Sequence, residues 1–182
     1  LPGPAFLYAG EELGLPDVDD LPDEFIDDPV WRRSGFTIRG RDGCRVPLPW
    51  AGDAPPFGFS PPGVRTWLPQ PAAWASMTAE KQDADPASML SLYRAALALR
   101  HGHPGLAGGA FGWNAAPAGV LAFERGAAFQ CVVNVSGDPV PLPPGSVVLL
   151  RSDAHAVPGD PLPANAAVWL DARSRRGPVV PH

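Results

Sequence analysis

The stretch DPASMLSLYRAALALRH, Asp85 to His101, carries the one helical pattern of useful length in this chain of 182 residues. Asp85 suits the N-cap and Pro86 suits the first helical position, because that position needs no backbone N–H. Six apolar residues follow at helical spacing before Gly102 and Pro104 end the pattern: Met89, Leu90, Leu92, Tyr93, Leu97 and Leu99. They cover more than one stripe, so we expect a helix over 85–101 that packs against a sheet and neighbouring helices.

Beyond this helix the sequence favours strands. Four runs rich in β-branched and aromatic residues are separated by Gly, Pro, Asn and Asp: VLAFER (120–125), AFQCVVNV (128–135), SVVLLRS (146–152) and AVWLDA (167–172). PVPLP (139–143) is a fifth, weaker run. The pattern predicts an antiparallel sheet or β-sandwich in a second domain over 105–182, with a boundary between residues 102 and 115.

Before the helix the chain is mostly irregular. The apolar run AFLY (5–8) follows a Pro-Gly-Pro turn and predicts a strand buried on both faces. From Leu15 to Gln82 no hydrophobic period is sustained, although four of the six tryptophans lie there. An irregular segment of this length is uncommon in a compact domain and tends to be functional when it is ordered.

The composition indicates which binding partners and which cellular compartment to expect for this protein. The 25 prolines and 20 glycines shorten regular elements, and a net charge of −5 without a basic run excludes nucleic acid and anionic membranes as expected partners. No apolar run approaches the roughly 20 residues of a membrane span.

Cys44 and Cys131 lie far apart in the sequence, and neither has a metal-ligand neighbour. We therefore expect both to be free thiols in a cytoplasmic protein, and we expect no metal or cofactor. Without an initiator methionine, and opening in an apolar stretch, the chain resembles a piece of a longer polypeptide.

Catalytic signatures are scarce. The sequence contains no G-x-S-x-G, no phosphate-cradling glycine loop and no H-E-x-x-H. Paired carboxylates perform glycoside hydrolysis, and Glu11–Glu12 or Asp17, Asp19 and Asp20 offer carboxylates. Adjacent residues of a strand point to opposite faces, so Glu11 and Glu12 cannot form one pair there. We expect these acids to hold structure.

The segment GRDGCRVPLPW, Gly40 to Trp50, places Arg41, Asp42 and Arg45 in a loop. An arginine fork suits carboxylates and hydroxyl-rich ligands, and an aspartate can hold that fork in one orientation. The alternative is a solvated or structural ion pair, which is the commoner role of such residues in loops.

Several motifs together carry a family resemblance: LPGPAFLYAGEELGLPDV (1–18), Asp28-Pro29 with Trp31, GRDGCRVPLPW (40–50), Gly58-Phe59, WLPQP (67–71) and DPASMLSLYRAALALRH (85–101). In this order and spacing they resemble the C-terminal part of an α-glucosidase of glycoside hydrolase family 13, the α-amylase family. The oligo-1,6-glucosidase, sucrose and maltose hydrolase and trehalose synthase subgroup is the most similar one.

The resemblance implies a fold of α/β plus all-β class. Residues 1–104 would supply the last strand, long loop and last helix of a (β/α)8 TIM barrel, and 105–182 would form a C-terminal antiparallel β-sandwich. The family is retaining, and its catalytic carboxylates precede the motif that LPG resembles, so this chain is expected to contain none of them. The missing N-terminal barrel portion, in the same or another chain, is then a partner.

The resemblance also assigns roles within the loop. Arg41 matches the arginine that lies near the glucose site, and Asp42 is expected to orient it. Arg45 is expected to brace the loop through ion pairs, while Glu12 and Trp50 are structural residues near the site. Gly43-Cys44, Val46 and Leu48-Pro49 depart from the family's usual RDNARTPMQW. We expect Trp50 and Trp67 to pack the loop down, and leave open whether Trp31 packs or stacks on a sugar.

Three functions remain open at this point. The first is an α-glucosidase that hydrolyses terminal α-linked glucose from disaccharides or short oligosaccharides. A trehalose synthase or related α-glucosyl transferase shares the barrel and the two-step mechanism. The third alternative is a non-catalytic carbohydrate-binding fragment, which the opening strand disfavours because its edges would be unpaired without the other barrel strands.

Overall fold

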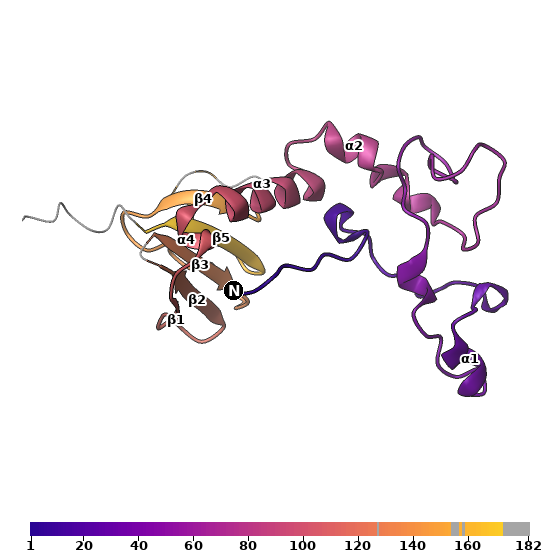
Figure 1. The fold of residues 1–182 in the computed structure, drawn as a ribbon, viewed down its shortest axis with the longest axis horizontal. Helices are drawn as coiled ribbons and strands as arrows, with labels where there is room; N and C mark the ends of the chain where they lie inside the picture. The colour runs from indigo at the N-terminus through magenta and orange to yellow at the C-terminus, as the bar shows by residue number, and fades with distance from the viewer. Residues whose placement is uncertain (127, 154–156, 158, 173–182) are drawn as a thin grey trace, which may run out of the picture. The chain divides into compact units, whose positions relative to one another are not determined.

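The structure, a computed structural model, describes residues 1–126, 128–153, 157 and 159–172 (Figure 1). The chain divides into two compact units. One unit combines Leu1–Pro4 with Leu92–His182, and the other is Ala5–Ser91. Among the described residues, no helix is both long enough and apolar enough to cross a membrane.

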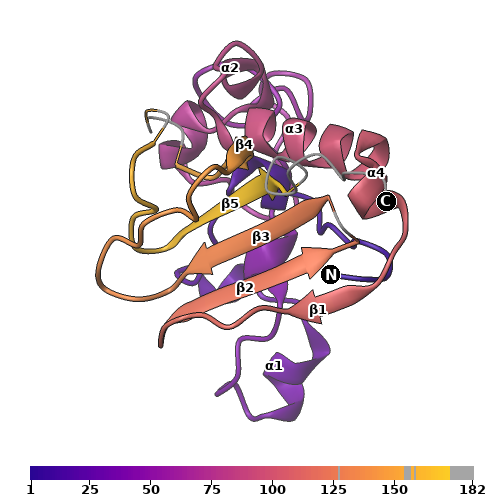
Figure 2. The same ribbon diagram turned by 90° about the vertical axis from the view of Figure 1, so that its left-hand side faces the viewer.

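The first unit is built on a five-stranded antiparallel sheet of order β1-β2-β3-β5-β4 (Figure 2). Its strands are β1 (Phe111–Trp113), β2 (Val120–Arg125), β3 (Phe129–Asn134), β4 (Val147–Arg151) and β5 (Ala166–Asp171). Strand β3 pairs along its whole length with β2 and with β5, from Phe129 to Asn134. A register shift between Val148 and Leu150 interrupts the pairing of β4 with β5.

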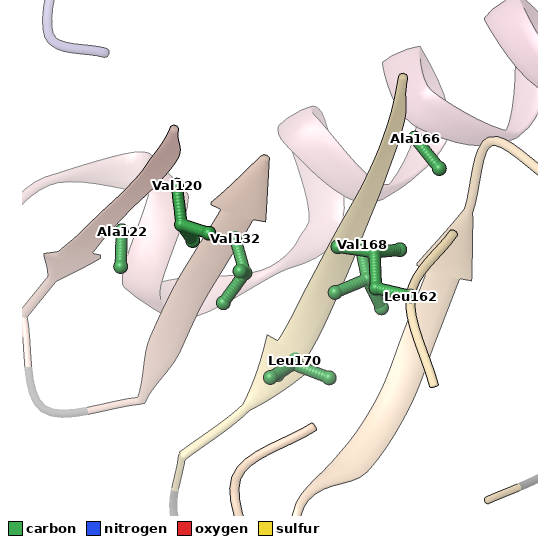
Figure 3. Close-up of a cluster of buried hydrophobic side chains, with 7 residues drawn as sticks. All are labelled: Val120, Ala122, Val132, Leu162, Ala166, Val168 and Leu170. Carbon is green, nitrogen blue, oxygen red and sulfur yellow. The ribbon is translucent and has the colours of Figure 1, made fainter. Parts of the chain in front are cut away.

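Both faces of the sheet carry apolar clusters, because successive side chains of a strand point to opposite faces. The cluster drawn in Figure 3 consists of Val120, Ala122, Val132, Leu162, Ala166, Val168 and Leu170. The other cluster is formed by Leu106, Phe129 and Cys131, with Phe123 and Trp169 packed against it. Leu106 comes from the short helix α4 (Pro104–Ala107). The sheet is therefore covered by buried side chains on both sides of its central strands.

The predicted antiparallel sheet is confirmed, but one of its strands was predicted wrongly. PVPLP contributes only an isolated bridge between Val140 and Leu162, because its three prolines have no N–H to donate to a ladder. The fifth strand is instead β1, which the sequence pattern did not indicate. The described residues form one sheet, and the expected domain over 105–182 includes residues 127, 154–156, 158 and 173–182, which lie outside them.

The predicted helix is confirmed as α3 (Met89–Gly102), but it begins four residues later than expected. Asp85 accepts from the amide of Ala87 in a turn, at 2.8 Å. The cap is Ser88, whose hydroxyl accepts from the amide of Ser91 at 3.1 Å. No residue of α3 is fully buried. The described residues therefore do not cover the apolar side chains of α3 to the extent that the sequence pattern predicts.

The strand predicted over AFLY is absent, and this prediction is corrected. Residues 5–8 carry no regular structure, all four are exposed, and Phe6 is 88% exposed. A strand buried on both faces needs neighbouring strands to accept and donate its backbone hydrogen bonds. None of the described strands pairs with these residues.

The second unit is held together by loops and short helices, as the lack of periodicity predicts. Its helices are the 3-10 turns Glu11–Leu13, Asp23–Phe25, Asp42–Arg45 and Ala72–Ser76, with α1 (Pro29–Arg33) and α2 (Ala79–Asp83). Its buried cluster consists of Val18, Leu21, Val46, Phe57, Leu68 and Trp74. The buried carboxamide of Gln82 donates to the carbonyl of Leu13 at 2.8 Å, which ties α2 to the start of the unit.

Candidate functional site

Four charged residues of the second unit form one connected group, the Asp28 cluster: Asp28, Arg41, Asp42 and Arg45. Asp42 is 7% exposed. Its Oδ2 accepts from the amides of Asp27 and Asp28, both at 2.7 Å, and its Oδ1 accepts from Arg45 Nη1 at 3.2 Å. Asp42 thus fixes the backbone that enters α1.

Asp28 occupies the centre of the cluster and is 8% exposed. Its Oδ1 accepts from the amide of Val30 at 3.0 Å, which caps α1. Its Oδ2 accepts from the amide of Arg41 at 3.2 Å and from Arg45 Nη1 at 3.1 Å. One carboxylate therefore joins α1 to two positions of the loop over 40–50.

These contacts favour the charged forms of Asp28 and Arg45. Donation from the Val30 amide, supported by the Arg41 amide and by the charges of Arg45 and Arg41, lowers the pKa of Asp28 against the opposing effect of burial. The hydrogen bond from Arg45 to Asp42 is the largest cause that raises the pKa of Arg45. The ion pair between Asp28 and Arg45 is thus the stable state at neutral pH.

Gly40 lets the loop approach Asp28. Its φ of +76° lies in the left-handed region, and a Cβ placed there would lie 2.6 Å from Asp28 Cβ and 2.9 Å from Val30 Cγ1. Any larger residue would push the loop away from the carboxylate. This explains why the GRDG segment begins with glycine.

Arg41 is the member of the cluster that faces solvent. Its side chain is 78% exposed, and its Nε lies 4.0 Å from Asp28 Oδ2. Arg41 lines a cavity of about 310 Å³, together with Asp17, Asp19, Arg39, Asp42, Cys44 and five apolar or glycine residues. A guanidinium beside carboxylates in such a cavity can donate to, and accept from, the hydroxyl groups of a polar ligand.

A second cavity of about 270 Å³ shares Asp17, Gly43 and Cys44 with the first. Tyr8 and Glu11 add polar groups to its lining. The thiol of Cys44 donates to the carbonyl of Arg41 at 3.1 Å. Within the described residues, no group of three or more His, Cys, Asp or Glu side chains is arranged to hold a metal ion, and both cysteines are free thiols.

The sequence reasoning brought Arg41, Asp42 and Arg45 together, and the structure shows how they differ. Asp42 binds backbone amides and Arg45, whereas the carboxylate nearest Arg41 is that of Asp28. Arg45 makes ion pairs with Asp28 and with Asp42. Sequence reasoning gave Asp28 no role at this site, although its place before Pro29 marks it as a helix cap.

The two other expected residues lie outside the Asp28 cluster. Glu12 accepts from the amide of Gly10 at 2.9 Å and so holds its own turn. Trp50 is exposed, and its backbone pairs with Phe57 and Glu80. Trp67, expected to pack, is also exposed and lies edge-on to Phe59, whereas Trp31 is buried against Phe36.

Comparison with known proteins gives concordant matches. A probable α-glucosidase of Rhizobium meliloti (strain 1021) is 34% identical over 141 residues, which cover 76% of this chain and 25% of that protein. The trehalose synthase/amylase TreS of Mycobacterium tuberculosis (strain H37Rv) is 32% identical over 157 residues, covering 78% of this chain and 23% of that protein. The chain thus spans about a quarter of the length of the curated relatives it matches.

Solved structures agree with these matches. The α-glucosyl transfer enzyme XgtA superposes with a TM-score of 0.73 at 34% identity, over 92% of this chain and 32% of that chain. The isomaltulose synthase PalI from Klebsiella sp. LX3 superposes with a TM-score of 0.72 over 91% of this chain and 35% of that chain. At 24% identity, PalI supports the fold alone.

The model of the α-amylase family, described as the α-amylase catalytic domain, matches residues 1–109, which is more than half of the chain. The resemblance found in the motifs is therefore confirmed, and the chain belongs to the α-amylase family, whose members are enzymes of the α-glucosidase and amylase type.

Proposed function

We propose that this chain is the C-terminal part of a retaining α-glucosidase that hydrolyses terminal α-linked glucose from disaccharides or short oligosaccharides. The observation that carries the proposal is the exposed guanidinium of Arg41, which lines a cavity and lies 4.0 Å from the buried carboxylate of Asp28. Family membership supports a sugar substrate, and the probable α-glucosidase of Rhizobium meliloti supports hydrolysis.

In this proposal the residues in and near the loop have different roles. Arg41 donates hydrogen bonds to sugar hydroxyls in the cavity, and Asp42 accepts from the same ligand or keeps the loop in place. Arg45, Glu12 and Trp50 support the loop. The catalytic carboxylates are supplied by the part of the polypeptide that precedes these residues in the family.

The fold of the complete protein belongs to the same proposal. We propose that residues 1–104 supply the last strand, loop and helix of the (β/α)8 barrel, with AFLY forming the strand once neighbouring barrel strands pair with it, and that 105–182 form the C-terminal β-sandwich. The exposed AFLY segment and the partly exposed apolar residues of α3 support this, because both need neighbouring barrel elements to become buried. The two free thiols support a reducing compartment such as the cytoplasm.

A second candidate is α-glucosyl transfer, as in a trehalose synthase. It is favoured by the TreS relative and by the α-glucosyl transfer enzyme XgtA, which match this chain about as well as the α-glucosidase does. Both activities use one barrel and one covalent intermediate, and they differ in whether water or a sugar accepts the glucosyl group.

The test uses the complete polypeptide that contains this chain. Glucose release from maltose, isomaltose and sucrose is measured while trehalose and other transfer products are followed. Arg41→Ala is expected to lower kcat/KM by roughly 10- to 100-fold, the effect of losing a hydrogen bond from a charged group. Arg45→Ala is expected to lower it less, because Arg45 acts on the loop and not on the sugar.

Arg32→Ala is the matched control, since Arg32 is an exposed arginine of the same unit with one loose ion pair to Asp27. It should leave turnover unchanged. Turnover by the Arg41→Ala variant equal to that of the control would refute the assigned role of Arg41. Sugar products in place of free glucose would select the transferase.

A further inference from the structure

We propose that Asp28 is a positioning residue that sets both the backbone and the guanidinium of Arg41 for substrate. The inference rests on the proposed function of Arg41. It assigns the orienting role to a residue 13 positions earlier in the chain, and not to the adjacent Asp42.

The backbone evidence comes from both sides of the peptide that links Gly40 to Arg41. The amide of Arg41 donates to Asp28 Oδ2 at 3.2 Å. On the preceding residue, the Cα of Gly40 is packed so closely against Asp28 that a Cβ would lie 2.6 Å from it. The position of this peptide therefore follows the position of the Asp28 side chain.

The charge balance of the cluster gives the second line of evidence. Asp28 and Asp42 are two buried carboxylates, and Arg45 is the guanidinium that forms ion pairs with both among the residues that the structure describes. Arg39, which lines the same cavity, is engaged elsewhere, with Asp23 at 2.7 Å. The two carboxylates thus carry one more negative charge than Arg45 offsets, and this charge attracts Arg41. Asp28 Oδ2 lies 4.0 Å from Arg41 Nε, so the Asp28 carboxylate carries the negative charge that faces the Arg41 side chain.

Asp28→Asn in the complete polypeptide tests this role. Asparagine caps a helix about as well as aspartate, so α1 keeps its cap, while the negative charge that faces both Arg41 and Arg45 is lost. We expect KM for the preferred disaccharide to rise about tenfold, with kcat changed less than about threefold, since a misplaced binding group weakens ground-state binding. Asp27→Asn is the matched control, because it makes the same change at the exposed neighbouring carboxylate.

A double-mutant cycle with Arg41→Ala distinguishes positioning from general support. If Asp28 acts through Arg41, Asp28→Asn should have no further effect on KM in the Arg41→Ala background. Multiplied effects would overturn the positioning role while leaving Arg41 as the substrate-binding residue. Unchanged turnover of Arg41→Ala alone would instead overturn the assigned role of Arg41 and this inference together.

Rescue by guanidinium ion supplies a readout that a purely structural role would not move. At millimolar concentration the ion should restore part of the activity of Arg41→Ala, because the Asp28 carboxylate holds it in the vacated place. Rescue should be lost in the Arg41→Ala, Asp28→Asn double variant. Equal rescue of both variants would contradict the proposal, and thermal melting curves verify that each variant is folded.

Discussion

At the scale of single residues, the two cysteines show how position sets the chemistry of one side chain. Cys131 lies on the central strand β3, beneath Leu106 and beside Trp169, and is buried. Burial raises the pKa of the Cys131 thiol to about 11. Cys44 is partly exposed and lines both cavities of the second unit. The two thiols should therefore differ sharply in reactivity.

We expect iodoacetamide at pH 8 to alkylate Cys44 and to leave Cys131 unmodified. A thiol with a pKa of about 11 is ionised in roughly one molecule in a thousand at pH 8, and Cys131 is also buried, whereas Cys44 is partly exposed to the reagent. Mass spectrometry of the peptides that carry the two thiols measures the outcome, and denaturant should make both react. Equal rates in the folded protein would show that Cys131 is not buried as described.

The same shift makes stability depend on pH. Because the folded pKa of Cys131 is raised, its stabilising contribution is complete below the unfolded value near 8.5 and is lost as pH rises toward about 11. Asp28 behaves in the opposite way, since its pKa is lowered by the Val30 amide. Its contribution is present above the unfolded value near 3.9 and is lost in acid.

How much of the candidate site the sequence could predict follows from the spacing of its residues. Arg41, Asp42 and Arg45 are neighbours in a recognisable segment, so the resemblance alone groups them. Asp28 contacts Arg41 and Arg45 across 13 and 17 residues of aperiodic loop, and no local pattern encodes that contact. Asp28 entered the family resemblance only as part of the Asp28-Pro29 motif, and an aspartate before proline is typical of a helix cap and not of a charge partner.

At the scale of elements, Asp85 and Ser88 both lie near the start of α3 and both have side chains suited to a helix cap, but their hydrogen bonds differ. Ser88 accepts from the amide of Ser91 and donates to the carbonyl of Gln82 at 2.7 Å, in a buried place. Asp85 is exposed and accepts from the amide of Ala87. The capping rules favour both residue types, so only the local hydrogen bonds decide between them.

We therefore expect Ser88→Ala to lower the free energy of unfolding by about 1–2 kcal/mol, since it removes a cap and leaves buried partners unsatisfied. Asp85→Ala, the cap that the sequence suggests, should cost less than about 0.5 kcal/mol. Urea unfolding followed by circular dichroism measures both. A larger loss for Asp85→Ala would show that the helix begins at the earlier position.

The remaining elements show where pattern reading succeeds. Strands β2 to β5 are runs of β-branched and aromatic residues long enough to be recognised. Strand β1 has three residues and one of them is glycine, so its pairing with β2 is decided by tertiary contacts. AFLY has the composition of a buried strand but lacks strands to pair with, and composition cannot supply them.

At the scale of the whole molecule, the two units differ in how much structure they can hold by themselves. In the sheet unit, β3 is hydrogen-bonded on both sides, and buried clusters cover both faces. The other unit has helices of three to five residues and one buried cluster of six side chains, and it leaves Phe6 exposed. A buried core of this small size is not expected to offset the conformational entropy that the unit loses on folding.

We expect residues 92–182, expressed alone, to fold cooperatively, and residues 5–91 to collapse without a single ordered state. Dispersed amide signals in NMR spectra and slow hydrogen exchange in β3 and β5 should mark the former, and binding of a hydrophobic dye the latter. A sharp thermal transition in residues 5–91 would show that its loop cluster suffices for an independent fold.

A pair of substitutions ties this result to the sheet core. Val168→Asp should unfold residues 92–182, because Val168 is fully buried in the cluster of Figure 3 and a lone buried carboxylate costs several kcal/mol. Val135→Asp makes the same change at an exposed valine and should leave the fold intact. If both variants stay folded, the stability of the unit cannot come from this face of the sheet, and the cluster around Phe129 must provide it.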